Sequence, residues 1–308
     1  MLAHDPSRLP LTQDVRFTEN GQKLKLGQAL WGTISGLGVY HVYFTDPQAG
    51  EVGYFGVVKE NDMPVILALR LRIVSQKIAE AETIVVRPSG SGPMANGALN
   101  LERIKEPNPV WSEVIPPSQR MSREDLIKTA NMYFTGLQRN DGKGVYPFTD
   151  DCNRLENGTQ TTNVGAPMPF ILKHANDPPV PGDPSLPPLR PASPPPAANA
   201  DVPPMTRIPY MGCRAQFASG WYNMVARIRD RRFLVVDPVH GAVMTFVFFD
   251  HDGRPPPPIT VNGKTYQSRG LLWTWEMSEA FKIEQGKIRF VEAVMTQAPY
   301  GMKPGWPD

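Results

Sequence analysis

Apolar and polar residues alternate along several stretches of the chain, which is the pattern of β-strands with one buried face. The alternation is clearest over residues 66–73, where Arg70 and Arg72 share one face. Turn dipeptides such as Asn20-Gly21 separate these stretches. We therefore expect strands over the following ranges: 14–19, 51–59, 64–74, 78–87, 152–156, 225–237, 242–250, 271–284 and 287–296.

Helical spacing of apolar residues is confined to a few places. Ser122 is a good N-cap residue, and Asp125 follows it by three positions. The apolar stripe that comes after this cap consists of Leu126, Ile127, Ala130, Tyr133, Phe134 and Leu137. It predicts a helix that packs against a core, and shorter helices are expected over 24–31 and 212–221.

The chain contains two copies of one pattern. Ile73, Lys77, Ile78 and Glu82 recur at a constant spacing as Ile283, Lys287, Ile288 and Glu292. The motif Phe-Thr-Glu-Asn-Gly at 17–21 also returns as Arg-Leu-Glu-Asn-Gly at 154–158. Such a repeat predicts two copies of one structural unit, each with its own core.

The repeat divides the chain into three parts. A first unit over 1–88 lacks opening helices, a Gly-, Ser- and Pro-rich linker follows over 89–120, and a second unit covers 121–308. Trp111 in the linker is a candidate for anchoring the linker as a strap across the neighbouring unit. Each unit reads as α+β, with helices on one face of a curved antiparallel sheet.

Proline is unusually frequent, with 34 among 308 residues, against an average of about 5%. Many of the prolines lie in an insertion at about 177–209, and a second cluster occupies 255–258. Neither stretch can continue a ladder or a helix, so both are expected to be extended loops. Each loop either lies on the surface without a further role or forms a lid over a pocket.

Composition excludes several classes of function. The net charge of +2 gives no basic surface suited to nucleic acid, and no apolar run reaches the ~18 residues that span a bilayer. The five histidines lack the spacing of a metal site, and phosphate- or dinucleotide-binding motifs are absent from the sequence. We expect no nucleic acid, membrane, metal or cofactor partner.

Cys152 and Cys213 form either a disulfide or two free thiols. The start of the chain, Leu2-Ala3-His4, reads like the last turn of a helix whose beginning has been removed. Localisation therefore stays open between an extracytoplasmic protein that has lost its leader and a cytoplasmic one. A disulfide would favour the former.

The order of elements resembles the nuclear-transport-factor-2-like, or SnoaL-like, superfamily, which includes scytalone dehydratase, ketosteroid isomerase and limonene epoxide hydrolase. The segments at 3–10 (Ala-His-Asp-Pro-Ser-Arg-Leu-Pro) and 150–158 (Asp-Asp-Cys-Asn-Arg-Leu-Glu-Asn-Gly) look like those of a tandem branch of it. The resemblance implies a cone-shaped unit with an apolar cavity, whose polar wall groups perform acid–base chemistry on hydrophobic molecules. No catalytic set of a characterised member matches this chain residue by residue.

Strand alternation selects the candidate catalytic residues. It places Arg154 and Glu156 on the inward face of one strand, and Glu292 on the inward face of the last strand. Buried carboxylates are costly unless they are paired or line a polar cavity. Either Arg154 keeps one carboxylate ionised while apolar walls raise the pKa of the other, or the groups form a structural pair. Asp151 is a further candidate at the cavity rim.

Five aromatic side chains are candidates for substrate binding. Trp273 and Trp275 share one strand face, and Tyr222 follows the expected short helix. Tyr40 and His41 belong to a cluster of His, Tyr and Asp in the first unit. Core packing and, for His41, a surface position are the simpler alternatives.

These observations predict a cofactor-independent lyase, dehydratase or isomerase that acts on a hydrophobic oxygenated small molecule in the second unit. A non-catalytic small-molecule-binding protein is the main alternative, and an epoxide-hydrolase-like hydrolase is the third. A homo-oligomer formed through sheet faces is a further possible assembly.

Overall fold

The computed structural model describes residues 1–88, 94–174, 194–197, 206–261, 263–267 and 269–306. Its strands are β1 (Leu11–Glu19), β2 (Gln22–Leu24), β3 (Ile34–Asp46), β4 (Glu51–Glu60), β5 (Met63–Val74), β6 (Lys77–Val86), β7 (Phe148–Glu156), β8 (Thr159–Gln160), β9 (Arg227–Asp237), β10 (Ala242–Asp252), β11 (Ile259–Val261), β12 (Lys264–Tyr266), β13 (Leu272–Glu284) and β14 (Lys287–Ala298). Its α-helices are α1 (Leu30–Thr33), α2 (Gly97–Ile104), α3 (Arg123–Leu137), α4 (Pro169–Leu172) and α5 (Cys213–Ala218). Short 3-10 helices include η2 (Pro109–Ser112), η5 (Ile208–Tyr210) and η6 (Trp221–Met224). None of the helices in this described part is long and apolar enough to cross a membrane.

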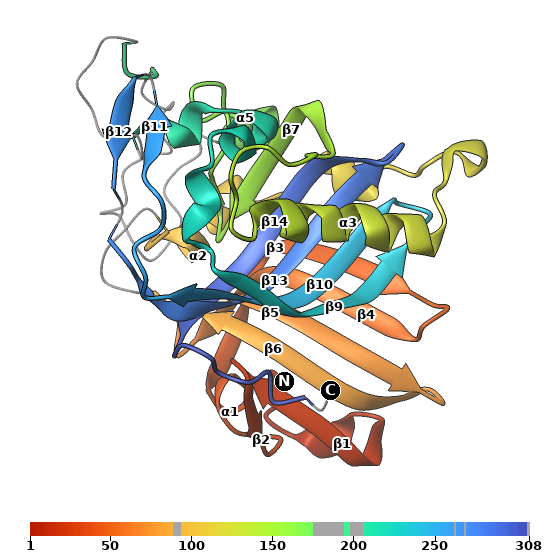
Figure 1. Ribbon diagram of the computed structural model, residues 1–308. Helices are drawn as coiled ribbons and strands as arrows, with labels where there is room; N and C mark the ends of the chain where they lie inside the picture. Colours follow the sequence, from red (N-terminus) through yellow and green to blue (C-terminus); the bar gives the residue numbers. More distant parts are fainter. Residues whose placement is uncertain (89–93, 175–193, 198–205, 262, 268, 307–308) are drawn as a thin grey trace.

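The strands form two six-stranded sheets with the same order of equivalent strands (Figure 1). The first sheet runs β2-β1-β6-β5-β4-β3, and the second runs β8-β7-β14-β13-β10-β9. This equivalence confirms two tandem α+β units. The sheets are mixed rather than antiparallel, because β1 pairs with β6, and β7 with β14, in parallel. The parallel pairs join strands far apart in the chain, so adjacent sequence patterns could not reveal them.

The two sheets pack against each other through one face each, here called the inter-sheet face. A single hydrophobic cluster contains residues of both units there, including Phe44 and Ile66 of the first and Phe246 and Phe290 of the second. The linker completes this core. Trp111 of η2 is buried with its ring edge-on to Phe44 and Phe290, as its predicted role as a strap requires.

The opposite face of the second sheet is covered by α3, which crosses it in Figure 1, and is here called the α3 face. The predicted cap is present, because the Ser122 side chain accepts a hydrogen bond from the Asp125 backbone N–H. The apolar stripe of α3 is buried against Phe281 and other strand residues in a second hydrophobic cluster. Both faces of this sheet are therefore buried.

Several local predictions need correction. The edge strand β3 and helix α2 were not expected, and the segment from residue 24 to 31 contains mainly turn before α1 begins. Ala29 and Asn20 have positive φ angles, as turn residues do. Most of the proline-rich insertion at 177–209 lies outside the described residues.

Cys152 of β7 and Cys213 of α5 are bonded in a disulfide. It fastens α5 to the edge region of the second sheet and closes a loop with a sequence separation of 61 residues. Arg214 reinforces this attachment, since its guanidinium donates hydrogen bonds to the backbone carbonyls of Tyr146, at 2.8 Å, and Phe148.

Replacing both cysteines by alanine is expected to lower the free energy of unfolding by about 2–5 kcal/mol, because the unfolded chain gains conformational freedom. Denaturant unfolding without reductant would measure the difference. Wild-type protein in reductant should match the double variant, and an unchanged midpoint in both would contradict a stabilising disulfide.

Candidate functional site

Arg154 is the centre of a buried polar cluster on the α3 face. Its guanidinium Nη1 donates to the Tyr133 hydroxyl at 3.0 Å, and Nη2 donates to Gln216 Oε1 at 2.7 Å and to the Tyr222 hydroxyl. Glu156 completes the arrangement as an ion-pair partner, with Oε1 at 3.5 Å from Nη2. Arg154 is only 2% exposed, so these partners replace the water that a free guanidinium would bind.

Four different elements bring these side chains together. Arg154 and Glu156 lie two positions apart on β7, so strand geometry points both to the same face. Tyr133 comes from the buried stripe of α3, while Gln216 lies on α5 and Tyr222 on η6. The disulfide holds β7 and α5 together within a few residues of Arg154 and Gln216.

Glu279 of β13 is a second carboxyl group in this cluster and is only 1% exposed. Neither of its oxygens makes a hydrogen bond of normal geometry with the described residues. Burial, together with the nearby Glu156, raises the pKa of Glu279 to about 8, even though Arg154 and the Tyr133 hydroxyl act to lower it. The Glu279 carboxyl group is therefore mostly protonated at pH 7.

Strand register explains why the two carboxyl groups meet. Glu156 pairs with Ala293 of β14, and Ala293 pairs with Glu279 of β13. The three residues form one row across the sheet, with the smallest side chain in the middle. The outer two are separated by two strand spacings, or roughly 10 Å between Cα atoms, and the alanine leaves the space above it to longer side chains.

The structure separates Glu292 from this cluster and corrects its predicted place. Glu292 lies on the inter-sheet face, where its carboxyl oxygens accept hydrogen bonds from the Tyr40 hydroxyl at 2.9 Å and from Trp111 Nε1 at 2.8 Å. Burial raises its pKa to about 7, even though these two hydrogen bonds act to lower it. Because both faces of the sheet are buried, the apolar neighbours of Glu292 did not identify which face it occupies.

The equivalent Glu82 of the first unit has a similar structural role. It lies on the inter-sheet face and pairs with Arg232 of β9, with 2.5 Å between Oε1 and Nη2. Each matched glutamate thus reaches across to the edge strand of the other unit, since Tyr40 belongs to β3. This matched pair of glutamates, Glu82 and Glu292, joins the two units.

The remaining candidates lie in three places. Asp151 has a 70% exposed side chain and lies 3.6 Å from Arg289 Nε, away from the Arg154 cluster. Tyr40 is fully buried between the sheets, whereas the side chain of His41 points to the outer face of the first sheet, where Nδ1 is 2.8 Å from the Tyr54 hydroxyl. The predicted cluster of His, Tyr and Asp is divided between two faces, because successive residues of β3 point to opposite sides. His41 and Tyr43 lie together, with ring centroids 6.5 Å apart, whereas Tyr40 and Asp46 are buried on the other face.

Trp273 and Trp275 lie on the same face of β13 as Glu279, as strand alternation requires. Their rings are 5.6 Å apart in an edge-on arrangement, and His251 stands at the same distance from Trp273. Both tryptophans are partly buried. They extend the α3 face from Glu279 towards the start of β13.

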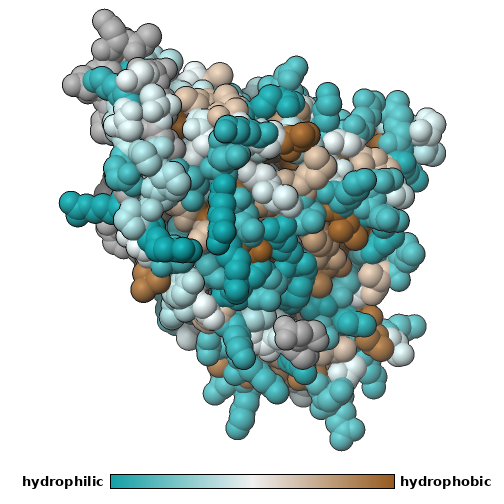
Figure 2. All heavy atoms as spheres, in the orientation of Figure 1, coloured by the Kyte–Doolittle hydropathy of each residue, from teal (hydrophilic) through white to brown (hydrophobic). Residues whose placement is uncertain are grey.

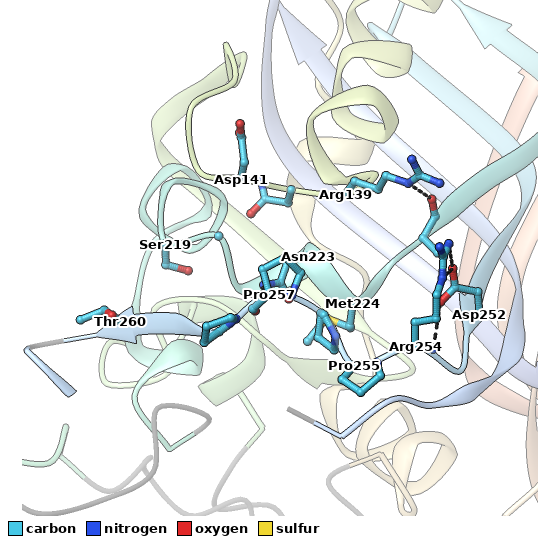
Figure 3. A pocket seen from close by; sticks show the side chains of 15 residues that line it. Arg139, Asp141, Ser219, Asn223, Met224, Asp252, Arg254, Pro255, Pro257 and Thr260 are labelled. Carbon is cyan, nitrogen blue, oxygen red and sulfur yellow. Dashed lines mark hydrogen bonds and ion pairs between the residues drawn. The ribbon is translucent and has the colours of Figure 1, made fainter. Parts of the chain in front are cut away.

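A cavity of about 570 Å³ opens at the end of the second sheet where β9 begins and β10 ends. Figure 3 shows Pro255 and Pro257 on one wall, with Asn223 and Met224 of η6 beside them and Arg139 beyond. The expected proline loop therefore borders a cavity. A second cavity, of about 310 Å³, lies beside Asp151 and Arg289.

Sequence reasoning missed Glu279, Tyr133 and Gln216 as functional candidates. Glu279 carried a usable signal, since it alternates with Trp275, Met277 and Phe281 on an otherwise apolar strand face. Tyr133 was expected only as core, and nothing in the sequence around Gln216 indicated a polar site. Within the described residues, no group of three or more His, Cys, Asp or Glu side chains is arranged to hold a metal ion.

The Arg154 cluster lies within a segment that matches a family model. The model is described as a domain of unknown function (DUF8021), and it matches residues 119–295. The chain belongs to this family. The DUF8021 segment begins just before α3 and ends within β14, so it contains every member of the cluster. No curated protein and no solved structure matches the chain.

Proposed function

We propose that the second unit is a cofactor-independent acid–base enzyme, a lyase or isomerase, that acts on a hydrophobic oxygenated small molecule. The observation that carries the proposal is Glu279, a buried carboxyl group without a hydrogen-bond partner of normal geometry among the described residues, beside the Arg154–Glu156 ion pair. An unpaired buried carboxyl group is costly for folding. Its position next to charged and hydroxyl groups is typical of a functional site.

The two carboxyl groups suit different roles. Glu279 holds its proton near neutral pH, so it acts as the general acid that protonates a leaving hydroxyl or a carbonyl oxygen. Glu156, held by Arg154, accepts a proton from the substrate carbon. Arg154 and the Tyr133 and Tyr222 hydroxyls stabilise negative charge that develops on the substrate oxygen.

In a dehydration these roles form a balanced sequence. Glu156 removes the proton from the carbon next to a carbonyl group, and the electron pair forms the new double bond. The C–O bond of the hydroxyl group breaks, and Glu279 supplies the proton with which that group leaves as water. In an isomerisation Glu279 instead protonates the oxygen of the dienolate, Glu156 returns the abstracted proton to the γ-carbon, and Glu279 takes its proton back as the carbonyl group re-forms.

The likeness in element order to nuclear-transport-factor-2-like proteins supports the same proposal. In this interpretation α3 and the second sheet form the cone of that superfamily, with the Arg154 cluster on its inner wall. The first unit, whose matched glutamate joins the sheets, is mainly a scaffold.

A panel of hydrophobic β-hydroxy ketones, secondary alcohols and β,γ-unsaturated ketones, analysed by mass spectrometry and NMR, tests this proposal. The Glu279→Gln variant is expected to lower turnover of any converted compound about 10²–10⁴-fold, the usual contribution of a general acid. Glu156→Gln is expected to have a comparable effect.

Glu276→Gln is the matched control, because Glu276 lies on the same strand, is buried, and has a pKa raised to about 8 by burial and by Glu82 on the inter-sheet face. It should keep turnover. Compounds that bind but leave unchanged would identify a binding protein instead, and full turnover in both Glu279→Gln and Glu156→Gln would refute the assignment.

A further inference from the structure

The Arg154 cluster has few routes to solvent. Arg154, Tyr133, Gln216 and Glu279 are each at most 2% exposed. Tyr222 is partly buried, so its ring reaches towards the surface while its hydroxyl contacts Arg154. The Glu156 side chain is 14% exposed, and the cover that Tyr222 belongs to is a second route by which a substrate of the proposed reaction reaches the buried groups.

The cover, residues 208–224, has one firmly held part and one lightly held part. The firm part is α5, which is tied by the disulfide at Cys213. The Gln216 amide Nε2 also donates to the backbone carbonyls of Thr161 at 2.6 Å and Ile208 at 2.7 Å. The disulfide and the bond to Thr161 fix the first half of the cover to the second sheet and its neighbouring loop, and the bond to Ile208 holds the cover together internally.

The lightly held part is η6, which follows Gly220 and lacks a covalent tie to the sheet; its Tyr222 ring packs on Phe217 of α5 with ring centroids 5.2 Å apart. The Tyr222 hydroxyl bonds to Arg154 and to Gln216 Oε1, the latter at 2.7 Å, and Asn223 Nδ2 donates to the Pro257 carbonyl at 2.7 Å. Gly220 has a φ of 71°, a left-handed conformation that glycine adopts freely. This glycine allows the chain direction to change between the fixed helix and η6.

The outer cavity lies directly beside this lightly held part. Residues on both sides of Tyr222 in the chain line it, namely Ser219, Gly220, Asn223 and Met224, whereas Tyr222 itself does not. Figure 3 shows Ser219, Asn223 and Met224 around the cavity. Its volume of about 570 Å³ is that of a small-molecule site. The prolines and Met224 offer apolar contact, while Arg139 and Asn223 offer polar groups.

We propose that this outer cavity receives the substrate and that Tyr222 is the gate between it and the Arg154 cluster. Movement of η6 about Gly220 withdraws the Tyr222 hydroxyl from Arg154 and opens a path from the outer cavity to the cluster. An apolar molecule with a hydroxyl or carbonyl group fits both the cavity lining and the cluster. The assignment of a substrate rests on the proposed function, but the gate itself does not.

Thiol labelling measures access to the cluster without any substrate. Because the only two cysteines are disulfide-bonded, a cysteine introduced in the absence of reductant is the sole free thiol. Glu279→Cys and Met277→Cys place a thiol on the α3 face, and Ala280→Cys is the matched control on the inter-sheet face of the same strand. All three positions are buried, at 4% exposure or less.

Methyl methanethiosulfonate is expected to label the thiols at 279 and 277 at least tenfold faster than the thiol at 280. Adding Tyr222→Phe, which keeps the ring but removes both hydroxyl contacts, is expected to speed labelling at 279 and 277 about five- to tenfold and to leave 280 unchanged. Equal rates at all three positions, or a uniform acceleration by Tyr222→Phe, would overturn the gate. Failure to find turnover would leave these labelling results unaffected, so the two proposals are tested separately.

Discussion

The free energy of unfolding is expected to fall by several kcal/mol as the pH rises from about 4.5 to about 8. Glu276 and Glu279 have pKa values raised by burial from 4.5 to about 8, so the folded protein holds two protons that the unfolded chain releases near pH 4.5. Between these limits the folded state binds more protons than the unfolded state, and its stability therefore decreases with pH. Above about pH 8 the loss is complete.

The size of this effect follows from about 1.4 kcal/mol per pKa unit, which gives an upper limit of roughly 5 kcal/mol for each glutamate. Glu292, with a pKa raised to about 7, adds a smaller contribution in the same direction. Replacement by glutamine removes the titration and preserves the shape of the side chain.

Urea unfolding of the wild type, Glu276→Gln and Glu279→Gln at pH 5 and at pH 8.5 measures these contributions. Each variant is expected to lose less stability between the two pH values than the wild type does. Parallel profiles for all three proteins would show that these carboxyl groups titrate normally, and the acid role of Glu279 would then lose its basis.

Arg154→Met is expected to lower the free energy of unfolding by about 3–5 kcal/mol, because it leaves buried groups without their cation. Glu156 would lose its ion-pair partner, and Gln216 Oε1 and the Tyr133 hydroxyl would lose a donor. Because methionine fills a similar volume, the loss of stability is expected to arise from the unpaired polar groups and not from a cavity.

Two controls accompany this variant. Arg72→Met removes an arginine whose side chain is 50% exposed and whose Nη1 is 3.9 Å from Glu80 Oε1, and it is expected to cost less than about 1 kcal/mol. Adding Glu156→Gln to Arg154→Met should restore part of the lost stability, with a coupling of at least about 1 kcal/mol. If Arg154→Met alone matched the wild type, the cluster would not be a tightly paired buried site.

The ability of Glu279 to act as an acid and its cost to the stability of the protein have the same origin. A carboxyl group that stays protonated at neutral pH needs a dry environment, and that environment makes its ionised form expensive. The expected outcome for Glu279→Gln is accordingly a protein that is more stable at alkaline pH but less active. Such opposite effects are common where a site uses strained or poorly satisfied groups.

The sequence by itself determined the duplication, most strands, the capped helix α3 and the shared face of Arg154 and Glu156. These features depend on residues close together in the chain, because the spacing of apolar side chains and the choice of turn and cap residues determine local structure. The constant spacing between copies also gave the correct equivalence of Glu82 and Glu292, although not their role.

Only the tertiary structure decided which face of the second sheet carries each glutamate and which groups meet there. Alternation fixes faces relative to one another along a strand, but the parallel pairing of β7 with β14 sets which residues of separate strands share a row. That register put Ala293 rather than Glu292 beside Glu156 and so brought Glu279 into the cluster. Other features also depend on residues far apart in the chain and could not be read from a local pattern. They are the burial of both sheet faces, the disulfide, and the contacts that Tyr133 and Tyr222 make from other segments.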